Sequence, residues 1–455
     1  MINSKGPLRI LRCLDLRLSL ALCLILAVIS TLSIYPFIAT ADGLARIASA
    51  VSSGGGFTVL PPMQSYFMKA SIWLVGGLGL YTLFQVFSFY AATAITYKFL
   101  LNDFPPATAF FSSILTITTP MFFVFPAIIT DSALVFTCIA LIGVMISAIE
   151  PMKLNKISSF FALTILLCIL FGMRLNSIAV APVIVILILL FAKSFKWHAI
   201  AAIIISTAFV FYINSDLRKN SRPEALGMAW EIVAIAKSQP GEERLKHSLD
   251  FCGSTEGAIE KYNERYLNAV FWDGAPPLPV TCITSVEGSA KVKAVYFSMI
   301  KSQPLDWALM KLSFWARVYG MTAPLESIKR GIHDVDEKTI EWGGRNTTQQ
   351  ASMREYFFNG AESLGSLVYR PFVSVLLSML CLVFIFDKKI FPRFFCIWAI
   401  ANAYYAGFLI SAQSMEFRYF APTFYVNCII IVSLIAYSVA RLYRVASKKS
   451  GEAIQ

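Results

Sequence analysis

Four charged side chains lie directly beside long apolar runs of this sequence: Asp42, Asp131, Arg174 and Arg418. A charge is costly to place there, so function is a reasonable first hypothesis for each. The carboxylates of Asp42 and Asp131 are candidate general bases, able to deprotonate a hydroxyl that attacks an activated carbon. The guanidinium groups of Arg174 and Arg418 match the oxygens of a phosphate. The pattern suggests a transfer reaction with a phosphate leaving group.

Structural roles compete with these chemical ones. Asp42 is also placed to cap a helix that begins at Gly43, and Asp131 is placed to cap the apolar run that follows it. Arg418 has a nearby partner in Glu416, or could extend toward lipid headgroups. Lys69 and Arg46 are weaker candidates for the same phosphate-binding role.

The composition indicates which elements must hold these residues. Of the 455 residues 57% are hydrophobic and only 15% are charged, which is typical of a chain that uses a bilayer as solvent. The net charge of +12 comes largely from short clusters beside apolar runs rather than from one soluble patch. This distribution favours membrane orientation over nucleic-acid binding.

About ten apolar runs are long enough to cross a membrane, so we predict an all-α polytopic membrane protein. Pro120, Pro126 and Pro182 interrupt some of the third to sixth runs, which could therefore be broken or re-entrant. The expected spans are 18–39, 73–97, 106–128, 132–150, 157–173, 176–192, 197–213, 369–386, 390–411 and 420–441.

Cations mark alternate connections between these runs. The basic N-terminus precedes an apolar run that is longer than the core of a signal peptide, which favours a retained first span. The positive-inside rule then places both termini in the cytoplasm. The chain divides into a membrane region at 1–213, a large extracytoplasmic loop at 214–368 and a second membrane region at 369–455.

The large loop has the composition of a folded domain. Its stretches 223–237 and 305–319 show helical apolar spacing, and it contains Cys252 and Cys282, whereas the other seven cysteines lie in or beside apolar runs. In an oxidising compartment these two are expected to form a disulfide, the alternative being two unpaired buried thiols. No CxxC motif or Cys/His cluster indicates a metal site.

The ordered set of motifs resembles the GT-C superfamily of polytopic glycosyltransferases, which use polyprenyl-phosphate-linked sugars. Asp42 follows the first span, and the pair Pro61–Pro62 precedes the second, with Gln85 further on. Asp131 then follows a proline-broken span. The remaining motifs are an Arg-x-Asn turn at Arg174 and Asn176, the large loop, and Arg418–Tyr419 before the closing span.

The resemblance implies a hexosyl- or pentosyltransferase at the periplasmic face of a bacterial inner membrane. Asp42 or Asp131 would act as the base, and Arg174, Arg418, Lys69 and Tyr419 would bind the donor phosphate. Many relatives have a His where this chain has Leu60, and two acidic residues in the first loop where it has Asp42 alone. No cofactor is implied, although some relatives use a divalent ion.

The expected partners are a polyprenyl-phosphate-linked sugar, membrane lipid, and a surface glycan such as O-antigen or lipopolysaccharide. A surface protein such as a pilin is an alternative acceptor. An O-antigen polymerase or ligase would also have many spans and a large outer loop, but the early Asp42 with Pro61–Pro62 argues against it. A flippase would carry charges deep inside its spans.

Overall fold

The computed structural model describes most of the chain, and helices dominate it. Its described residues are 16–33, 39–40, 63–128, 131–152, 155–215, 219, 221–239, 241–265, 268–272, 274–325, 332–333, 365–385, 390–411 and 416–452. Within these ranges the only sheet is one short antiparallel pair, β1 (Ala39–Thr40) with β2 (Ile332–His333). The predicted all-α class is therefore confirmed for the described part of the chain.

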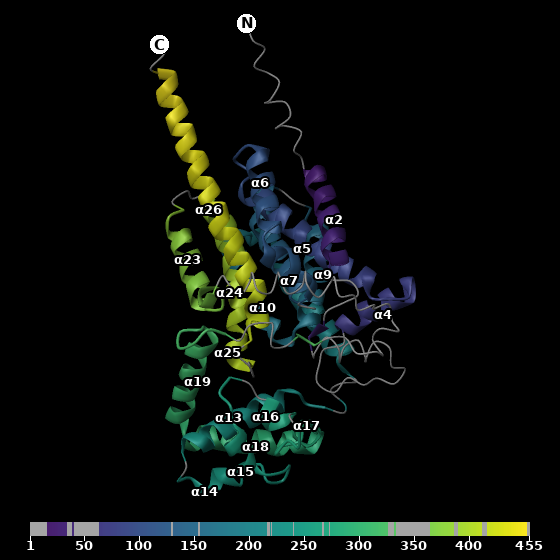
Figure 1. Cartoon of the computed structure of the whole chain (residues 1–455), viewed down its shortest axis with the longest axis vertical. Coiled ribbons are helices and arrows are strands. Elements are labelled where there is room, and N and C mark those ends of the chain that lie inside the picture. The colour runs from purple at the N-terminus through teal and green to yellow at the C-terminus, as the bar shows by residue number, and fades with distance from the viewer. Residues whose placement is uncertain are drawn as a thin grey trace.

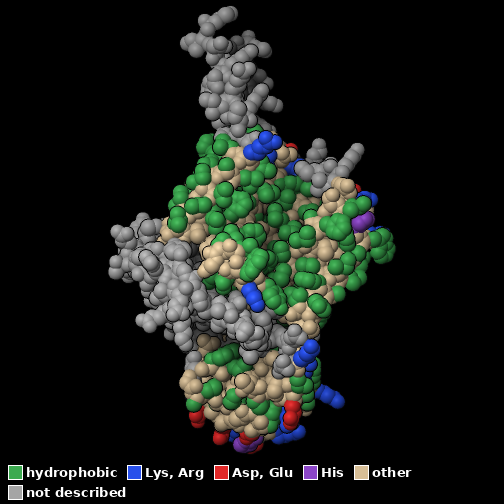
Figure 2. All heavy atoms as spheres, turned by 90° about the vertical axis from the view of Figure 1, so that its right-hand side faces the viewer, with side chains coloured by type: hydrophobic (Ala, Val, Ile, Leu, Met, Phe, Trp, Pro, Cys, Tyr) green, Lys and Arg blue, Asp and Glu red, His purple; other side chains and the backbone are tan. Residues whose placement is uncertain are grey.

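The molecule has an elongated helical bundle with a smaller helical domain at one end (Figure 1). Among the described residues, five helices of the bundle are long and apolar enough to cross a membrane. Figure 2 shows hydrophobic side chains covering the middle of the bundle, as expected for a surface that faces lipid. These helices are α2 (Leu16–Ser33), α8 (Ser132–Met152), α9 (Lys156–Met173), α11 (Lys196–Ile213) and α26 (Phe417–Glu452).

α8 lies at the centre of the bundle, and α5, α9, α24 and α26 pack around it. Its residues Val135, Phe136, Ile139 and Ile142 are fully buried. By contrast α2 exposes Leu24, Ile25 and Leu32 on the outside of the bundle.

Helices that are shorter or less apolar occupy the other predicted spans. They are α5 (Gly79–Leu100), α6 (Pro106–Ile117) with α7 (Pro120–Ile128), η1 (Leu175–Ala179) with α10 (Val180–Phe191), α23 (Pro371–Val383) and α24 (Phe391–Ala406). Pro182 falls in the first turn of α10, where a missing N–H costs little, so it does not break that helix.

The predicted interruption is found directly before Pro120, where the run divides into two helices, α6 and α7, whereas Pro126 lies inside α7. Pro126 lies inside α7 and has no N–H to donate to the carbonyl of Phe122. The carbonyl of the next residue, Phe123, accepts hydroxyl groups from two neighbouring helices. Tyr90 Oη of α5 donates to the carbonyl of Phe123 over 2.7 Å, and Ser30 of α2 donates to the same carbonyl.

The expected second span at 73–97 begins too early. α4 (Met63–Val75) ends directly before Gly76, whose φ of 72° turns the chain before α5 begins at Gly79. The exposed side chains of α4 include Trp73, which is 83% exposed, and Leu74. α4 is thus a separate short helix rather than the start of α5.

The helical domain spans residues 224–318. Its core packs Trp230 against Tyr262 and Phe314, with ring centroids 5.3 Å apart in each pair. The predicted helices at 223–237 and 305–319 are confirmed as α13 and α19. Its helices are α13 (Glu224–Ser238), α14 (Glu243–Lys246), α15 (Thr255–Lys261), α16 (Asn268–Phe271), α17 (Val280–Thr284), α18 (Val286–Ser302) and α19 (Pro304–Val318).

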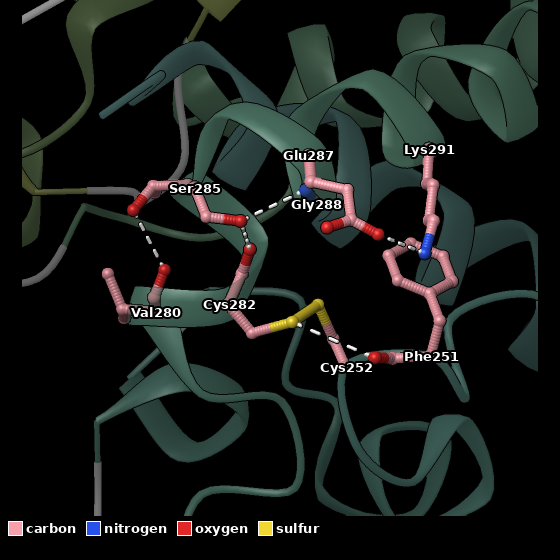
Figure 3. Close-up of a disulfide and its surroundings, with 9 residues drawn as sticks. Phe251, Cys252, Val280, Cys282, Ser285, Glu287, Gly288 and Lys291 are labelled. Atoms are coloured by element: carbon pink, nitrogen blue, oxygen red, sulfur yellow. Dashed lines mark hydrogen bonds and ion pairs between the residues drawn. A yellow bond between two sulfur atoms is a disulfide. The ribbon is translucent and has the colours of Figure 1, made fainter. Parts of the chain in front are cut away.

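A disulfide joins Cys252 to Cys282, as the sequence predicts (Figure 3). It ties the segment before α15 to α17, and the Cα atoms of the two residues are 5.5 Å apart. Next to it, Ser285 Oγ accepts the N–H of Gly288 over 2.9 Å and so caps α18.

The end of α19 attaches the helical domain to the bundle. Tyr405 Oη of α24 donates to the carbonyl of Val318 over 2.5 Å, and the N–H of Phe372 donates to the carbonyl of Tyr319 over 2.9 Å. Gly320 turns the chain with a φ of 69°, and a Cβ placed there would lie 2.9 Å from the Cα of Arg370. The domain is therefore fixed to the same bundle end from which α26 starts.

Candidate functional site

Four of the predicted site residues converge at the end of the bundle nearest the helical domain. Asp131 immediately precedes α8, and Arg174 stands between α9 and η1. Arg418 and Tyr419 lie in the first turn of α26. Segments more than two hundred residues apart thus supply one cluster, which we call the arginine cluster: Asp131, Arg174, Glu416, Arg418 and Tyr419.

The most buried part of this cluster is an ion pair between Arg174 Nε and a carboxylate oxygen of Asp131. The two side chains are 12% and 5% exposed, so little water screens them. Burial acts to lower the pKa of Arg174, but Asp131 and Tyr419 raise it, and the net direction is upward. Arg174 therefore stays charged, and Asp131 is held as its counter-ion.

Arg418 has a different carboxylate partner. Its Nε lies 2.5 Å from Glu416 Oε2, and its Nη2 donates to Glu416 Oε1 over 3.2 Å. The side chain of Glu416 is 31% exposed. The N-terminus of α26 is in turn attached to α8, since Ser132 Oγ donates to the carbonyl of Arg418 over 3.1 Å.

Tyr419 brings the two guanidinium groups together. The guanidinium carbons of Arg174 and Arg418 lie 5.3 Å and 5.0 Å from the centroid of its ring. Both distances suit cation–π attraction, which offsets part of the repulsion between two like charges. Nη2 of Arg418 also donates to the Tyr419 hydroxyl over 3.1 Å.

An aromatic series connects the cluster to the helical domain. The ring of Tyr419 lies 4.9 Å from Phe408 of α25 (Phe408–Ser411), and Phe408 lies 6.2 Å from Tyr405. Tyr405 contacts Tyr319 at 5.2 Å, directly after α19. Tyr405 is 2% exposed and therefore cannot move without its neighbours.

The sequence interpretation missed Gly407, Phe408 and Tyr405 as supports of this cluster. Gly407 packs on the backbone of η1, next to Arg174. The only signal in the sequence was that these residues lie near the end of the apolar run 390–411. Hydropathy does not predict which segments such a run contacts. Glu416 was considered only as a local partner of Arg418, and the structure contains that pairing.

Other predicted site residues are not part of the cluster as described. Lys69 lies exposed on α4, and no contact among the described residues joins it to the cluster. Asp42, Arg46, Leu60 and Pro61–Pro62 lie outside the described residues. Gln85 lies on α5, where its amide donates to the carbonyl of Pro126 over 3.3 Å.

Within the described ranges, no group of three or more His, Cys, Asp and Glu side chains could hold a metal ion. No known protein family, curated protein or solved structure matches the chain significantly. The function therefore has to be argued from the cluster itself.

Proposed function

We propose that the chain is a membrane glycosyltransferase that moves a sugar from a polyprenyl-phosphate donor to a cell-surface acceptor. The observation that carries this proposal is the placement of Arg174 and Arg418 against one Tyr419 ring at the end of an apolar bundle. A lipid-linked phosphate needs two things at once: an apolar surface for its chain, and cations at the edge of that surface for its head.

The arginines would act on the leaving group. The acceptor oxygen attacks the anomeric carbon of the donor while the bond from that carbon to the phosphate oxygen breaks. The phosphate leaves with the electron pair, and Arg174 and Arg418 stabilise its negative charge in a region of low dielectric. Cationic hydrogen-bond donors of this kind lower the barrier most when they face the atoms on which charge develops in the transition state.

The base is better assigned to Asp42 than to Asp131. A carboxylate that is buried against an arginine is stabilised as the anion and accepts a proton poorly. We therefore give Asp131 the task of holding Arg174, and Asp42 the task of taking the proton of the acceptor hydroxyl. The helical domain would shape the acceptor site and exclude water.

We also propose ten spans in a bacterial inner membrane, with cytoplasmic termini and the helical domain in the periplasm. The Cys252–Cys282 disulfide supports an oxidising compartment for that domain. Topology reporters fused at Ser194 and Asp273 should report the cytoplasm and the periplasm respectively. Equal signals from one side at both positions would contradict the arrangement.

The main experiment compares surface glycans between cells that carry the wild type, Asp42→Asn or Arg418→Ala, after membrane insertion is verified by immunoblot. Mass spectrometry should detect a lost sugar modification in both variants. Undiminished modification in both would refute the proposed site. The same comparison would identify a pilin acceptor or an O-antigen polymer, if either is the product that changes.

A flippase is the non-enzymatic alternative. It would change the distribution of a lipid-linked sugar across the membrane without forming a new glycosidic bond. An assay of donor orientation in vesicles, run beside the glycan analysis, separates the two functions.

A further inference from the structure

The two carboxylates of the arginine cluster differ strongly in burial. The side chain of Asp131 is 5% exposed, whereas that of Glu416 is 31% exposed. Asp131 directly precedes α8, which is the central helix of the bundle, and Glu416 directly precedes α26. A buried counter-ion is costly to remove, but a partly solvated one exchanges at little cost because water takes over its charge. An arriving anion should therefore displace Glu416 from Arg418 more easily than it displaces Asp131 from Arg174.

Glu416 occupies the donors that a phosphate would use. Its two carboxylate oxygens contact Nε and Nη2 of Arg418, the fork that guanidinium groups offer to phosphate as well as to carboxylate. The lipid phosphate left after sugar transfer is a monoester, which has more charge and more acceptor oxygens than a carboxylate and so competes well for such a fork. The sugar-bearing donor is a diester with a single charge and competes through its acceptor oxygens.

The local backbone lets the side chain of Glu416 move without unfolding the site. Phe417, the next residue, is fully buried, and its ring lies 5.1 Å from Tyr369. Ser132 holds the carbonyl of Arg418. The start of α26 is thus fixed, and rotation of the Glu416 side chain opens its two contacts with Arg418 while Nη2 keeps its hydrogen bond to the Tyr419 hydroxyl.

We infer that Glu416 is an internal competitor that a lipid-linked phosphate displaces from Arg418, and that its return helps to release the phosphate product. This inference rests on the proposed function, because it takes the arginine cluster as the phosphate site. Glu416 sets how tightly the phosphate is held, whereas Asp131 keeps Arg174 in place. Removing the negative charge of Glu416 should therefore tighten binding.

The test measures the binding of farnesyl phosphate to the full-length protein in phosphatidylcholine nanodiscs. Glu416→Gln keeps the shape of the side chain and removes its charge. We expect its Kd to be about fivefold lower than that of the wild type, the size of a partly exposed ion pair. Glu264→Gln is the matched control, because Glu264 also pairs with an arginine, Arg317, but in the helical domain. Its Kd should equal that of the wild type.

Two further probes separate the sources of the phosphate. Farnesol has the same chain without charge, and inorganic phosphate has the charge without a chain. Tightening with farnesyl phosphate but not with farnesol supports the displacement of Glu416 by a lipid headgroup. Equal tightening with inorganic phosphate shows that the site selects the phosphate alone and overturns the lipid part of the inference.

Failure of the inference is distinguishable from failure of the proposed function. If Arg418→Ala abolishes binding while Glu416→Gln leaves the Kd unchanged or raises it, the cluster binds phosphate and Glu416 is not a competitor. If Arg418→Ala binds farnesyl phosphate as the wild type does, the cluster is not the phosphate site and the proposed function loses its main support.

Discussion

Gly407 packs directly on the backbone of Asn176. A Cβ placed on Gly407 would lie 2.8 Å from the carbonyl oxygen of Asn176 and 2.9 Å from the Cβ of Ala179. η1, which begins immediately after Arg174, is therefore held against the end of α24 at a distance that only glycine permits. The position of Arg174 depends on a residue that has no side chain.

Gly407→Ala should push η1 away and displace Arg174 from Tyr419. We expect at least about a tenfold loss of glycan modification, since small displacements of a positioning group are costly to catalysis. Gly79→Ala is the control, because no atom would lie within 4 Å of its added Cβ. Similar activities of the two variants would show that η1 does not need this close contact.

Asp131→Asn should destabilise the bundle. It removes the negative partner of a guanidinium that is nearly buried, and we expect a loss of about 3 kcal/mol in the free energy of unfolding. Thermal unfolding of the purified protein in detergent measures the change. Glu287→Gln, which removes an exposed partner of Lys291, should leave the melting temperature within error of the wild type.

Tyr405→Phe should loosen the attachment of the helical domain while keeping the aromatic contacts. The variant leaves the carbonyl of Val318 without its hydroxyl donor, at a cost of about 1 to 2 kcal/mol. Hydrogen exchange should then be faster near the end of α19. Tyr212→Phe, at a tyrosine that is 77% exposed, is the comparison, and equal exchange in both variants would argue against the role of this hydrogen bond.

Cys252→Ser should destabilise the helical domain by about 3 kcal/mol, because the disulfide closes a loop across a sequence separation of 30. Limited proteolysis of membranes is the measurement, and cleavage within residues 224–318 should be faster. Cys381→Ser replaces a free, half-buried thiol of the bundle and should not change the pattern. Resistance equal to the wild type would mean that the domain is stable without the disulfide.

The sequence predicted the membrane helices and singled out Asp131, Arg174 and Arg418 as candidate site residues, but for different physical reasons. Apolar runs report burial in lipid directly, so α8, α9 and α11 were recognisable from hydropathy. The charged residues were recognisable because they lie beside apolar runs. The alternation of basic connections places distant segments at one face of the membrane without giving the distances between them, so their contact was found only in the structure.

Features set by tertiary contact were not predictable in the same way. The φ of Gly76, which separates α4 from α5, has no hydropathy signal because apolar residues continue on both sides. Nothing in the sequence near Phe123 says that Tyr90 and Ser30 will bond to its carbonyl. The contact of Gly407 with Asn176 joins segments more than two hundred residues apart, and no local pattern encodes it.

The length of α26 has a consequence for how this chain can vary. One uninterrupted helix runs from Phe417 to Glu452, about 54 Å at 1.5 Å per residue, which exceeds the thickness of the hydrocarbon core. A residue inserted near Ser433 would rotate one end against the other by about 100° and shift it by about 1.5 Å. Arg418 and Tyr419 would then no longer face Arg174 and α8 as they do now. α26 should thus tolerate many substitutions. Insertions and deletions between Arg418 and the middle of the bundle should not be tolerated.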